Sequence, residues 1–345
     1  MRRRLLFLVL PSALACHDTE RGALAGGSPT APSYTLGEDA TAGRISYLPL
    51  PNGLSDVSAV AINATGWILG TGSDNAGCHR IVLWSPRGSV ETLPFCAAPS
   101  DINARNQVTG SVTVGGQERA FVWTPGKGLR ELGSLNGTWS RAVATNDSGW
   151  VVGASGQVGV SQTGFVYTPG LGMRDLSQLA GTTVPEARAV NVRGDVLADE
   201  EGPPLASIIW HPVTGTRQLP PHLPDLYNRG RGHALNDLGE ATGIGPYDWF
   251  NDLRTLKWPA SGAPQLLRVW MRCIGLTYGT RIAEDGSILG ARYDCLDTRH
   301  VNYLWTSTHG TRFLTNYDQC WASDLSPSGK RAVGGCPGGP VVWDF

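Results

Sequence analysis

The sequence predicts an all-β protein, a β-propeller of seven four-stranded antiparallel blades closed by an N-terminal strand that completes the last blade. Three observations predict this fold. A repeat recurs seven times at intervals of about 40 to 48 residues, each copy reads as two hairpins, and the ends of the repeated region are complementary. The chain has 345 residues with 45 Gly, 23 Pro and 12 Trp, which suits many turns and recurring large core side chains.

The first half of each copy is an alternating run that ends in a tight turn. Asn146 followed by Gly149 marks the clearest example, and weaker copies begin near Ser100, Thr280 and Ser323. An Asn at the start of such a turn bonds its own backbone, and Gly adopts the positive φ that the turn requires. The recurring amides are therefore interpreted as turn residues and not as ligand-binding residues: Asn63, Asn103, Asn146, Asn191 and Asn236.

The second half of each copy is an apolar run that ends in an aromatic residue, usually followed by a Pro- and Gly-bearing turn and a short strand. A single four-stranded sheet cannot bury both of its faces, whereas seven sheets around an axis pack on one another. The aromatic residues that end these runs are Trp84, Trp123, Tyr167, Trp210, Trp258, Trp305 and Trp343.

The two ends of the repeated region complement each other. The seventh copy stops after Trp343 and lacks its fourth strand, while residues 45–50 form a spare strand with no copy before it. We expect these segments to pair and to close the ring. The propeller domain is accordingly predicted to span 44–345.

The N-terminus has the features of an export signal. Residues 1–15 contain three arginines, a short apolar core and a small-x-small cleavage site, which indicate a signal peptide. Cys16 follows directly and resembles the lipobox of bacterial lipoproteins, although Ala13 stands where that family prefers Leu. Residues 16–43 lack apolar periodicity and predict a flexible tether. We expect secretion across the inner membrane to the cell envelope or the exterior, with membrane contact by the lipid anchor only; the alternative is ordinary secretion with a free thiol.

Six further cysteines predict three disulfides in an exported chain. Their positions at predicted loops on one face of the ring favour these pairs: Cys78–Cys96, Cys273–Cys295 and Cys320–Cys336. The spacing has no CxxC pair, which argues against a zinc site.

Composition and motifs narrow the function classes. The formal net charge is -1, so the sequence lacks the basic footprint of a nucleic-acid-binding protein. We find no nucleophile elbow, zinc helix or phosphate loop and therefore predict no catalytic residues, cofactor or metal. Asp199, Glu200 and Glu201 lack the ordered spacing of a calcium loop and predict a solvated loop. We expect a monomer.

The loops between the second and third strands, and those between successive copies, should share one face of the ring. Variable loops on a rigid scaffold are where binding residues concentrate. The alternative is that the aromatic residues there cover blade junctions. The candidate ligand-binding residues on this face are Trp139, Tyr227, Asp248, Trp249, Phe250, Tyr278 and Trp321, with Asn251 and Asp252 beside them.

A second candidate feature is a set of basic residues in the innermost strands. If several of them face the axis, they favour an anionic ligand through bidentate contacts. The alternative is pairing with acidic residues or solvation. The residues are Arg141, Arg188, Arg231, His233 and Arg281.

The repeat resembles the bacterial extracellular HAF-repeat proteins, named for a His-Ala-Phe tripeptide followed by an aromatic residue. The match is strongest at 119–123, where Arg119 replaces the family's His, and at 144–153, and it covers about residues 45–345. The resemblance implies an extracellular propeller-like repeat protein without an established activity.

Two functions remain open at this point. One is a binding module for a glycan or protein ligand, without catalysis. The other is a propeller-type polysaccharide hydrolase or lyase that uses His233, Arg188 and Asp248 near the axis. Convergence of at least three His, Arg, Asp, Glu or Tyr side chains within hydrogen-bond reach, on one pocket at the loop-side mouth of the channel, would favour the enzyme. A flat aromatic rim would favour binding, and a purely structural assembly role remains if neither is present.

Overall fold

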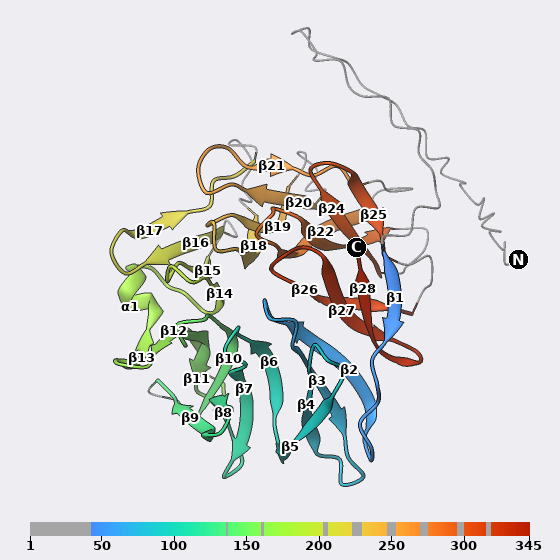
Figure 1. Cartoon of the computed structure of the whole chain (residues 1–345). Coiled ribbons are helices and arrows are strands. Elements are labelled where there is room, and N and C mark those ends of the chain that lie inside the picture. The colour runs from blue at the N-terminus through green and yellow to red at the C-terminus, as the bar shows by residue number, and fades with distance from the viewer. Residues whose placement is uncertain are drawn as a thin grey trace, which may run out of the picture. The chain divides into compact units, whose positions relative to one another are not determined.

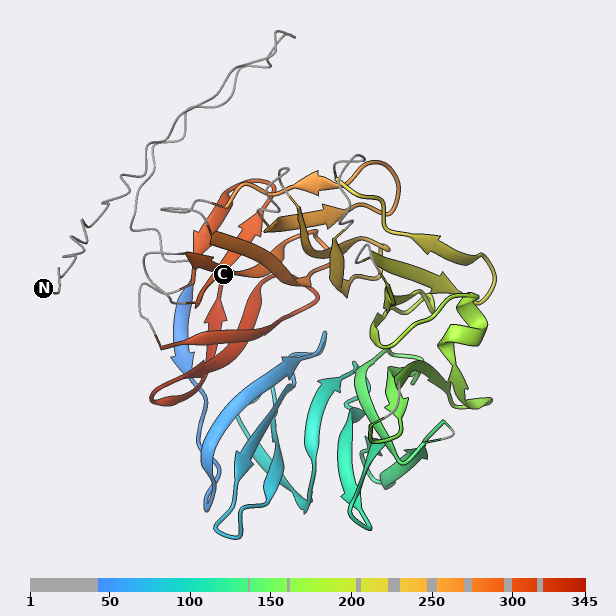
Figure 2. The same ribbon diagram turned by 180° about the vertical axis from the view of Figure 1, so that it is seen from behind.

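The described part of the chain is a closed ring of seven four-stranded antiparallel sheets around a central axis (Figure 1 and Figure 2). The computed structural model describes residues 43–345 apart from 136, 160–161, 203–205, 223–229, 247–252, 270–274, 295–299 and 315–318. The predicted seven-bladed propeller is therefore confirmed.

Blades 1 to 3 each consist of four consecutive strands, ordered from the axis outward. Blade 1 contains β2 (Ser55–Ile62), β3 (Ile68–Ser73), β4 (His79–Trp84) and β5 (Val90–Cys96). Blade 2 contains β6 (Ala98–Ile102), β7 (Val108–Val114), β8 (Gln117–Thr124) and β9 (Gly128–Gly133). Blade 3 contains β10 (Trp139–Thr145), β11 (Val151–Gly156), β12 (Gln162–Thr168) and β13 (Gly172–Asp175).

Blades 4 to 6 repeat this order. Blade 4 contains β14 (Ala187–Val190), β15 (Val196–Glu200), β16 (Ala206–His211) and β17 (Gly215–Gln218). Blade 5 contains β18 (Arg231–Leu235), β19 (Ala241–Pro246), β20 (Leu253–Trp258) and β21 (Gln265–Leu266). Blade 6 contains β22 (Gly275–Ile282), β23 (Ile288–Asp294), β24 (His300–Thr306) and β25 (Gly310–Phe313).

Blade 7 combines the two ends of the described chain. It contains β26 (Trp321–Leu325), β27 (Arg331–Cys336), β28 (Gly339–Asp344) and, as its outer strand, β1 (Arg44–Tyr47). Strand β1 is antiparallel to β28, with Ile45 opposite Trp343 and Tyr47 opposite Val341, and the two strands lie side by side in Figure 1. The predicted closure by the N-terminal strand is confirmed.

One short helix, α1 (Leu176–Ala180), occurs among the described residues and was not predicted. It lies in the connection between blades 3 and 4. Asp175 accepts hydrogen bonds from the Ser177 and Gln178 amides at its start, and Gly181 ends it with a φ of 71°. Asp at the N-cap and a left-handed Gly at the end favour a helical turn even in a loop of this length.

The tryptophans that end the third strands connect neighbouring blades. Trp84 is 1% exposed, and its indole nitrogen donates to the Pro49 carbonyl, which follows β1 of blade 7, at 2.8 Å. Trp258 donates in the same way to the Pro220 carbonyl of blade 4 at 2.8 Å. These two rings therefore fill the gap between two sheets and satisfy their polar atoms there, whereas the indole nitrogen of Trp343 is buried without a hydrogen-bond partner in the described part of the chain.

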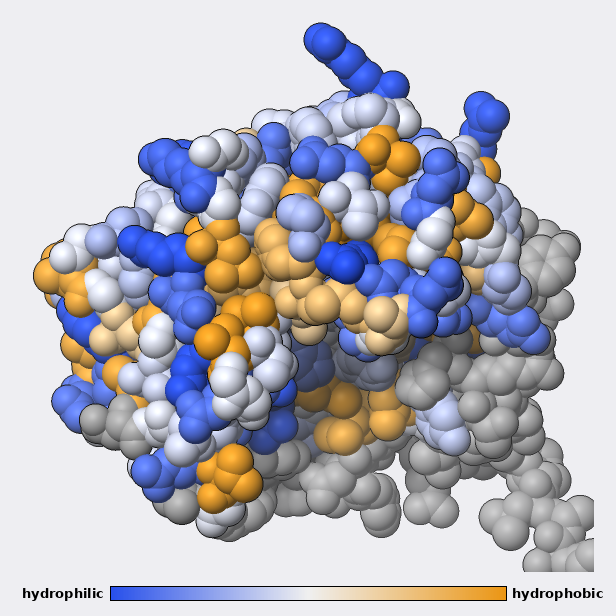
Figure 3. Space-filling view, turned by 90° about the horizontal axis from the view of Figure 1, so that it is seen from below, coloured by the Kyte–Doolittle hydropathy of each residue, from blue (hydrophilic) through white to orange (hydrophobic). Residues whose placement is uncertain are grey.

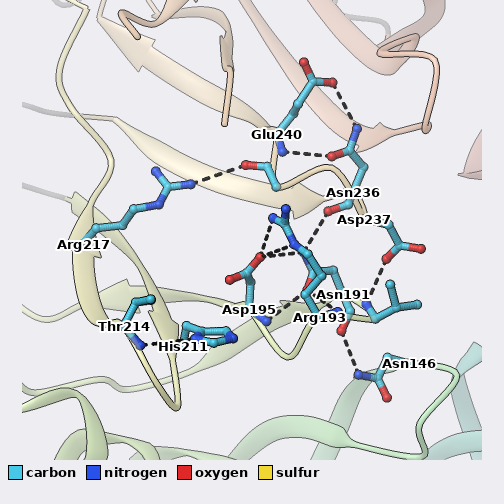
Figure 4. A network of polar contacts seen from close by, with 12 residues as sticks. Asn146, Asn191, Arg193, Asp195, His211, Thr214, Arg217, Asn236, Asp237 and Glu240 are labelled. Carbon is cyan, nitrogen blue, oxygen red and sulfur yellow. Dashed lines mark hydrogen bonds and ion pairs between the residues drawn. The ribbon is translucent and has the colours of Figure 1, made fainter. Parts of the chain in front are cut away.

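The recurring asparagines form a relay of side-chain hydrogen bonds between blades. Asn146 Oδ1 accepts from the Ser148 and Trp150 amides within its own turn, and Nδ2 donates to the Asn191 carbonyl of the next blade at 2.7 Å. Figure 4 shows this relay at Asn146, Asn191 and Asn236. It runs through blades 1 to 6 by the pairs Asn63–Asn103, Asn103–Asn146, Asn146–Asn191, Asn191–Asn236 and Asn236–Ala283.

The relay ends at blade 6, where Ala283 occupies the position of the Asn, and Ser326 occupies it in blade 7. The Glu284 amide donates to the Pro327 carbonyl at 2.8 Å, which links blades 6 and 7. Asp324 Oδ2 accepts from the Ile62 amide at 2.8 Å, which links blade 7 to blade 1. A carboxylate therefore joins the two ends of the ring in the core of the propeller.

Two of the three predicted disulfides are present, Cys78–Cys96 in blade 1 and Cys320–Cys336 in blade 7. The third predicted pair, Cys273–Cys295, lies outside the described residues, as do Cys16 and the predicted signal peptide and tether. Within the described residues, no helix is long and apolar enough to span a bilayer.

Candidate functional site

A cavity of about 470 Å³ runs along the axis and is lined by the innermost strands of all seven blades. Each of these strands shifts register by one residue shortly before its turn, so one extra residue bulges out of the ladder. The bulged residues are Val60, Ser100, Val143, Arg188, His233, Thr280 and Ser323. Arg188 and His233 are the two with basic side chains, and they lie in neighbouring blades.

A second cavity of about 300 Å³ lies between blades 5 and 6 and shares His233 with the axial cavity. Its residues stand at the beginnings of β18, β20 and β22 and at the end of β19, which is the predicted loop face. Among the described residues, Arg231 and His233 are its basic lining residues, and the others are Gly230, Ile244, Gly245, Leu253, Leu276 and Tyr278. The walls are therefore mainly carbon, with two nitrogen-bearing side chains at one side.

Arginines and carboxylates alternate beside this cavity. Arg188 donates twice to Asp199 Oδ2, at 2.5 and 2.8 Å, and lies 3.5 Å from Glu186. Arg141 bonds the other Glu186 oxygen at 3.2 Å. Arg231 Nε is 3.7 Å from Asp199 Oδ1, beyond hydrogen-bond distance. We call these five residues the arginine cluster.

His233 is held in one tautomer. Its Nδ1 lies 2.9 Å from the Gly279 carbonyl, which only accepts, so Nδ1 carries the proton and Nε2 keeps a lone pair. The Tyr278 ring packs edge-on against the imidazole with ring centres 6.0 Å apart. Burial lowers the pKa of His233 below its ordinary value of 6.5, the Gly279 bond opposes this, and nearby Arg188 lowers it further. The imidazole is therefore neutral near pH 7.

A second polar group, from blades 6, 7 and 2, lines the axial cavity. Arg281 Nε bonds Asp324 at 2.7 Å, and Asp101 Oδ2 accepts from the Thr145 amide of blade 3 at 2.8 Å. Burial raises the pKa of Asp101 to about 6, and the negative charge of Asp324 adds to the effect. Burial likewise raises the pKa of Asp324. Both carboxylates are occupied by groups of the protein, so they connect blades.

Three of the predicted aromatic residues lie in the described part of the chain, and one of them lines a cavity whereas two pack on glycines. Tyr278 lines the cavity between blades 5 and 6. Trp139 and Trp321 line neither cavity; each covers a glycine of its own blade, Gly156 and Gly335, where an added Cβ would lie 3.1 Å and 2.5 Å from the indole ring. Each of these two rings therefore packs on backbone within its own blade, and not on the blade junctions that the alternative predicted. Tyr227, Asp248, Trp249, Phe250, Asn251 and Asp252 lie outside the described residues.

The basic residues meet both of the outcomes that the sequence left open. Arg141, Arg188 and Arg281 pair with acidic residues, and Arg188 and Arg281 also line the axial cavity. Arg231, whose ion pair with Asp199 is longer, lines the second cavity together with His233. The prediction of a solvated loop at Asp199 is wrong: Asp199 is 4% exposed in strand β15 and pairs with Arg188. The sequence did contain a signal for this pair: Asp199 follows an apolar strand run and lies 11 positions after Arg188, across one hairpin.

No group of three or more potential metal ligands gathers in the part of the chain that the structure describes. The exposed apolar residues do not form one large patch on the face that Figure 3 shows, where orange residues occur in separate groups among blue and white ones. Among them, Val158, Leu171 and Val213 stand in loops or turns. The two cavities are the candidate ligand sites in the part of the chain that the structure describes.

Comparisons with known proteins support the fold only. No family model matches the chain, and no curated protein matches it. The Pyrococcus horikoshii acylaminoacyl peptidase is similar with a TM-score of 0.55 and 9% identity, over 84% of this chain and 51% of the peptidase. The Mycobacterium tuberculosis puromycin-hydrolyzing peptidase is similar with a TM-score of 0.52 and 13% identity, over 88% of this chain and 52% of that one. This chain spans about half the length of either peptidase, and at such identities the likeness establishes a propeller and no activity.

Proposed function

We propose that the chain is an extracytoplasmic binding module that holds a glycan at the junction of blades 4 to 6. The observation that carries this proposal is the convergence of Arg231, His233 and Tyr278 on one cavity with apolar walls. A sugar ring offers a C–H face for an aromatic ring and hydroxyls for polar groups, and this lining provides partners for both.

A glycan fits this site better than a folded protein does. A stable protein interface buries about 800 Å² on each partner and is centred on exposed apolar or aromatic anchors. Of the three described candidate aromatic residues, Tyr278 lines a small cavity, Trp139 covers a glycine, and Trp321, which is 50% exposed, stands apart from both. A concave site with a few convergent polar groups is typical of small-molecule and sugar recognition.

The proposed location rests on cysteine chemistry and on the N-terminus. Two disulfides suit an oxidising compartment outside the cytoplasm. The predicted signal peptide, lipidation at Cys16 and the resemblance to extracellular HAF-repeat proteins are consistent with the same compartment. We propose a lipoprotein of the cell envelope, tethered by residues 16–43.

The same convergence favours a second candidate, a polysaccharide lyase or hydrolase. His233 is neutral, and its Nε2 lone pair could accept a proton from a bound sugar, while the guanidinium groups beside it could stabilise developing negative charge. Incubation of bound glycan with the whole chain, followed by mass spectrometry of the products, separates the candidates. Shortened products that disappear in His233→Gln would establish catalysis, and intact glycan would favour the binding module.

A glycan array probed with the whole chain tests the binding proposal. We expect specific binding that is lost in Tyr278→Ala and retained in Trp321→Ala, because Tyr278 lines the cavity and Trp321 packs on Gly335. Thermal unfolding of both variants shows whether each is folded. Loss of binding in Trp321→Ala alone would move the site to the rim, and the absence of any bound glycan would contradict the proposal.

A further inference from the structure

We infer that the cavity between blades 5 and 6 recognises an acidic sugar, a uronic acid residue whose carboxylate binds Arg231 and whose ring lies against Tyr278. This inference rests on the proposed glycan-binding function and adds the charge of the ligand. Its basis is an unused donor, an unbalanced charge and the chemistry of the cavity walls.

Arg231 has an unused donor at the cavity. Its Nε is buried and has no hydrogen-bond partner within the described part of the chain. The nearest carboxylate oxygen, Asp199 Oδ1, lies 3.7 Å away, and the other Asp199 oxygen is held by Arg188 at 2.5 Å. The side chain as a whole is 36% exposed and lines the cavity, so the guanidinium is open to a carboxylate from that side.

The charges of the arginine cluster do not cancel. Three guanidinium groups face two carboxylates, and His233 is neutral, so one positive charge is left over. The unbalanced charge belongs to Arg231, because the other two arginines each bond a carboxylate within 3.2 Å. A guanidinium whose own partner is too distant favours an anion, and its planar fork suits a carboxylate.

The walls select for more than an anion. Leu253, Leu276, Ile244 and the Tyr278 ring form the apolar side of the cavity. An inorganic anion would leave this apolar surface uncovered, whereas the C–H face of a sugar ring would bury it. The ligand should therefore combine a carboxylate with a hydrocarbon face.

His233 adds a requirement for a hydroxyl. Its Nδ1–H is used by the Gly279 carbonyl, so Nε2 can only accept at neutral pH. A hydroxyl donates to such an acceptor, and a sugar supplies several hydroxyls. His233 also lines the axial cavity, which gives the next sugars of an oligosaccharide a path beyond the first site. Carboxylate, hydroxyl and C–H face together describe a uronic acid.

Isothermal titration calorimetry of the whole chain tests the inference with three probes: oligogalacturonate, its methyl ester and the corresponding neutral galactose oligomer. We expect the acid to bind about tenfold or more tightly than either neutral probe, since one charge-assisted contact is worth at least that ratio. Added salt should weaken binding of the acid and leave the neutral probes unaffected.

Three variants locate the effect. Arg231→Gln should bring the affinity for the acid to that for the ester. Arg141→Gln is the matched control, because it removes the same charge from the same cluster at a residue that lines neither cavity, and it should keep most of the preference. Arg231→Lys keeps the charge but loses the planar fork of the guanidinium, so its preference for the acid over the ester should lie between those of the other two variants. Thermal unfolding of each variant accompanies the titrations.

Each outcome has a defined meaning. Equal affinity for acid and neutral probes, or an equal loss in Arg141→Gln and Arg231→Gln, overturns the acidic-sugar inference and leaves the glycan-binding function standing. Binding to no glycan of either charge overturns the proposed function itself. Preference for an acidic peptide, such as oligoglutamate, over all three sugars would show that Arg231 serves a protein ligand and would overturn both.

Discussion

Replacing Asn146 with Ala tests whether the asparagine relay holds neighbouring blades together. The side chain accepts from the Ser148 and Trp150 amides at 3.0 Å and donates to the Asn191 carbonyl at 2.7 Å. Alanine removes all three bonds at a residue that is 5% exposed, so water cannot easily replace them. The Asn103 side chain keeps its bond to the Asn146 backbone carbonyl.

The expected loss follows from these three bonds. Each contributes about 1 kcal/mol net, so the free energy of unfolding should fall by about 3 kcal/mol. With an unfolding entropy of about 2.1 cal/mol/K per residue, a propeller of about 300 residues should unfold about 5 °C lower. The bond to Asn191 crosses between blades, so part of this loss weakens the packing of blade 3 on blade 4.

Differential scanning calorimetry measures the shift. Ser148→Ala is the matched control, since it lies in the same turn and its side chain is exposed; it should change stability by less than about 0.5 kcal/mol. An Asn146→Ala protein that unfolds within a degree of the parent would refute the role of the relay. A comparable loss in Ser148→Ala would assign the effect to the turn instead.

The remaining predictions concern pH and the disulfides. The pKa of Asp101 is raised from its ordinary 3.8 to about 6, so the native state binds this proton more tightly than the unfolded state does. The protonated carboxyl group therefore stabilises the native state fully below about pH 4, and this stabilisation is lost as the pH rises through about 6. Asp101→Asn should remove up to about 3 kcal/mol of that pH dependence, measured as urea unfolding from about pH 4 to about pH 7, and an unchanged profile would contradict it. Replacing both Cys320 and Cys336 by Ser removes the disulfide that closes a loop of sequence separation 16. The free energy of unfolding should fall by about 3 kcal/mol in the same assay. An unchanged free energy of unfolding would mean that the disulfide adds nothing to the surrounding packing.

The fold could be predicted from the sequence because its information is local and repeated. An Asn-to-Gly turn fixes one hairpin, a Trp before a Pro-Gly turn fixes the other, and seven copies leave the faces of each sheet no partner except another copy. The two described disulfides followed from the same register, since Cys78 with Cys96 and Cys320 with Cys336 fall on neighbouring loops.

The candidate site was only partly predictable because it depends on contacts between blades. Arg188, His233 and Tyr278 were named as candidates, but the sequence could not show that His233 meets Arg188 at the axial cavity and Tyr278 at the second cavity, which required the positions of β14, β18 and β22. The register shift that turns Arg188 and His233 toward the axis has no sequence mark of its own. Asp199 appeared to be a loop residue because its two acidic neighbours suggested solvent, whereas strand pairing buries it.

The most direct test of the whole account is a crystal structure of the chain with a bound acidic oligosaccharide. The account predicts a sugar ring between blades 5 and 6, against Tyr278, with its carboxylate within hydrogen-bond distance of Arg231 and a hydroxyl facing His233. Sugar density over Trp321 or Trp139, or on the face of the asparagine turns, would contradict it.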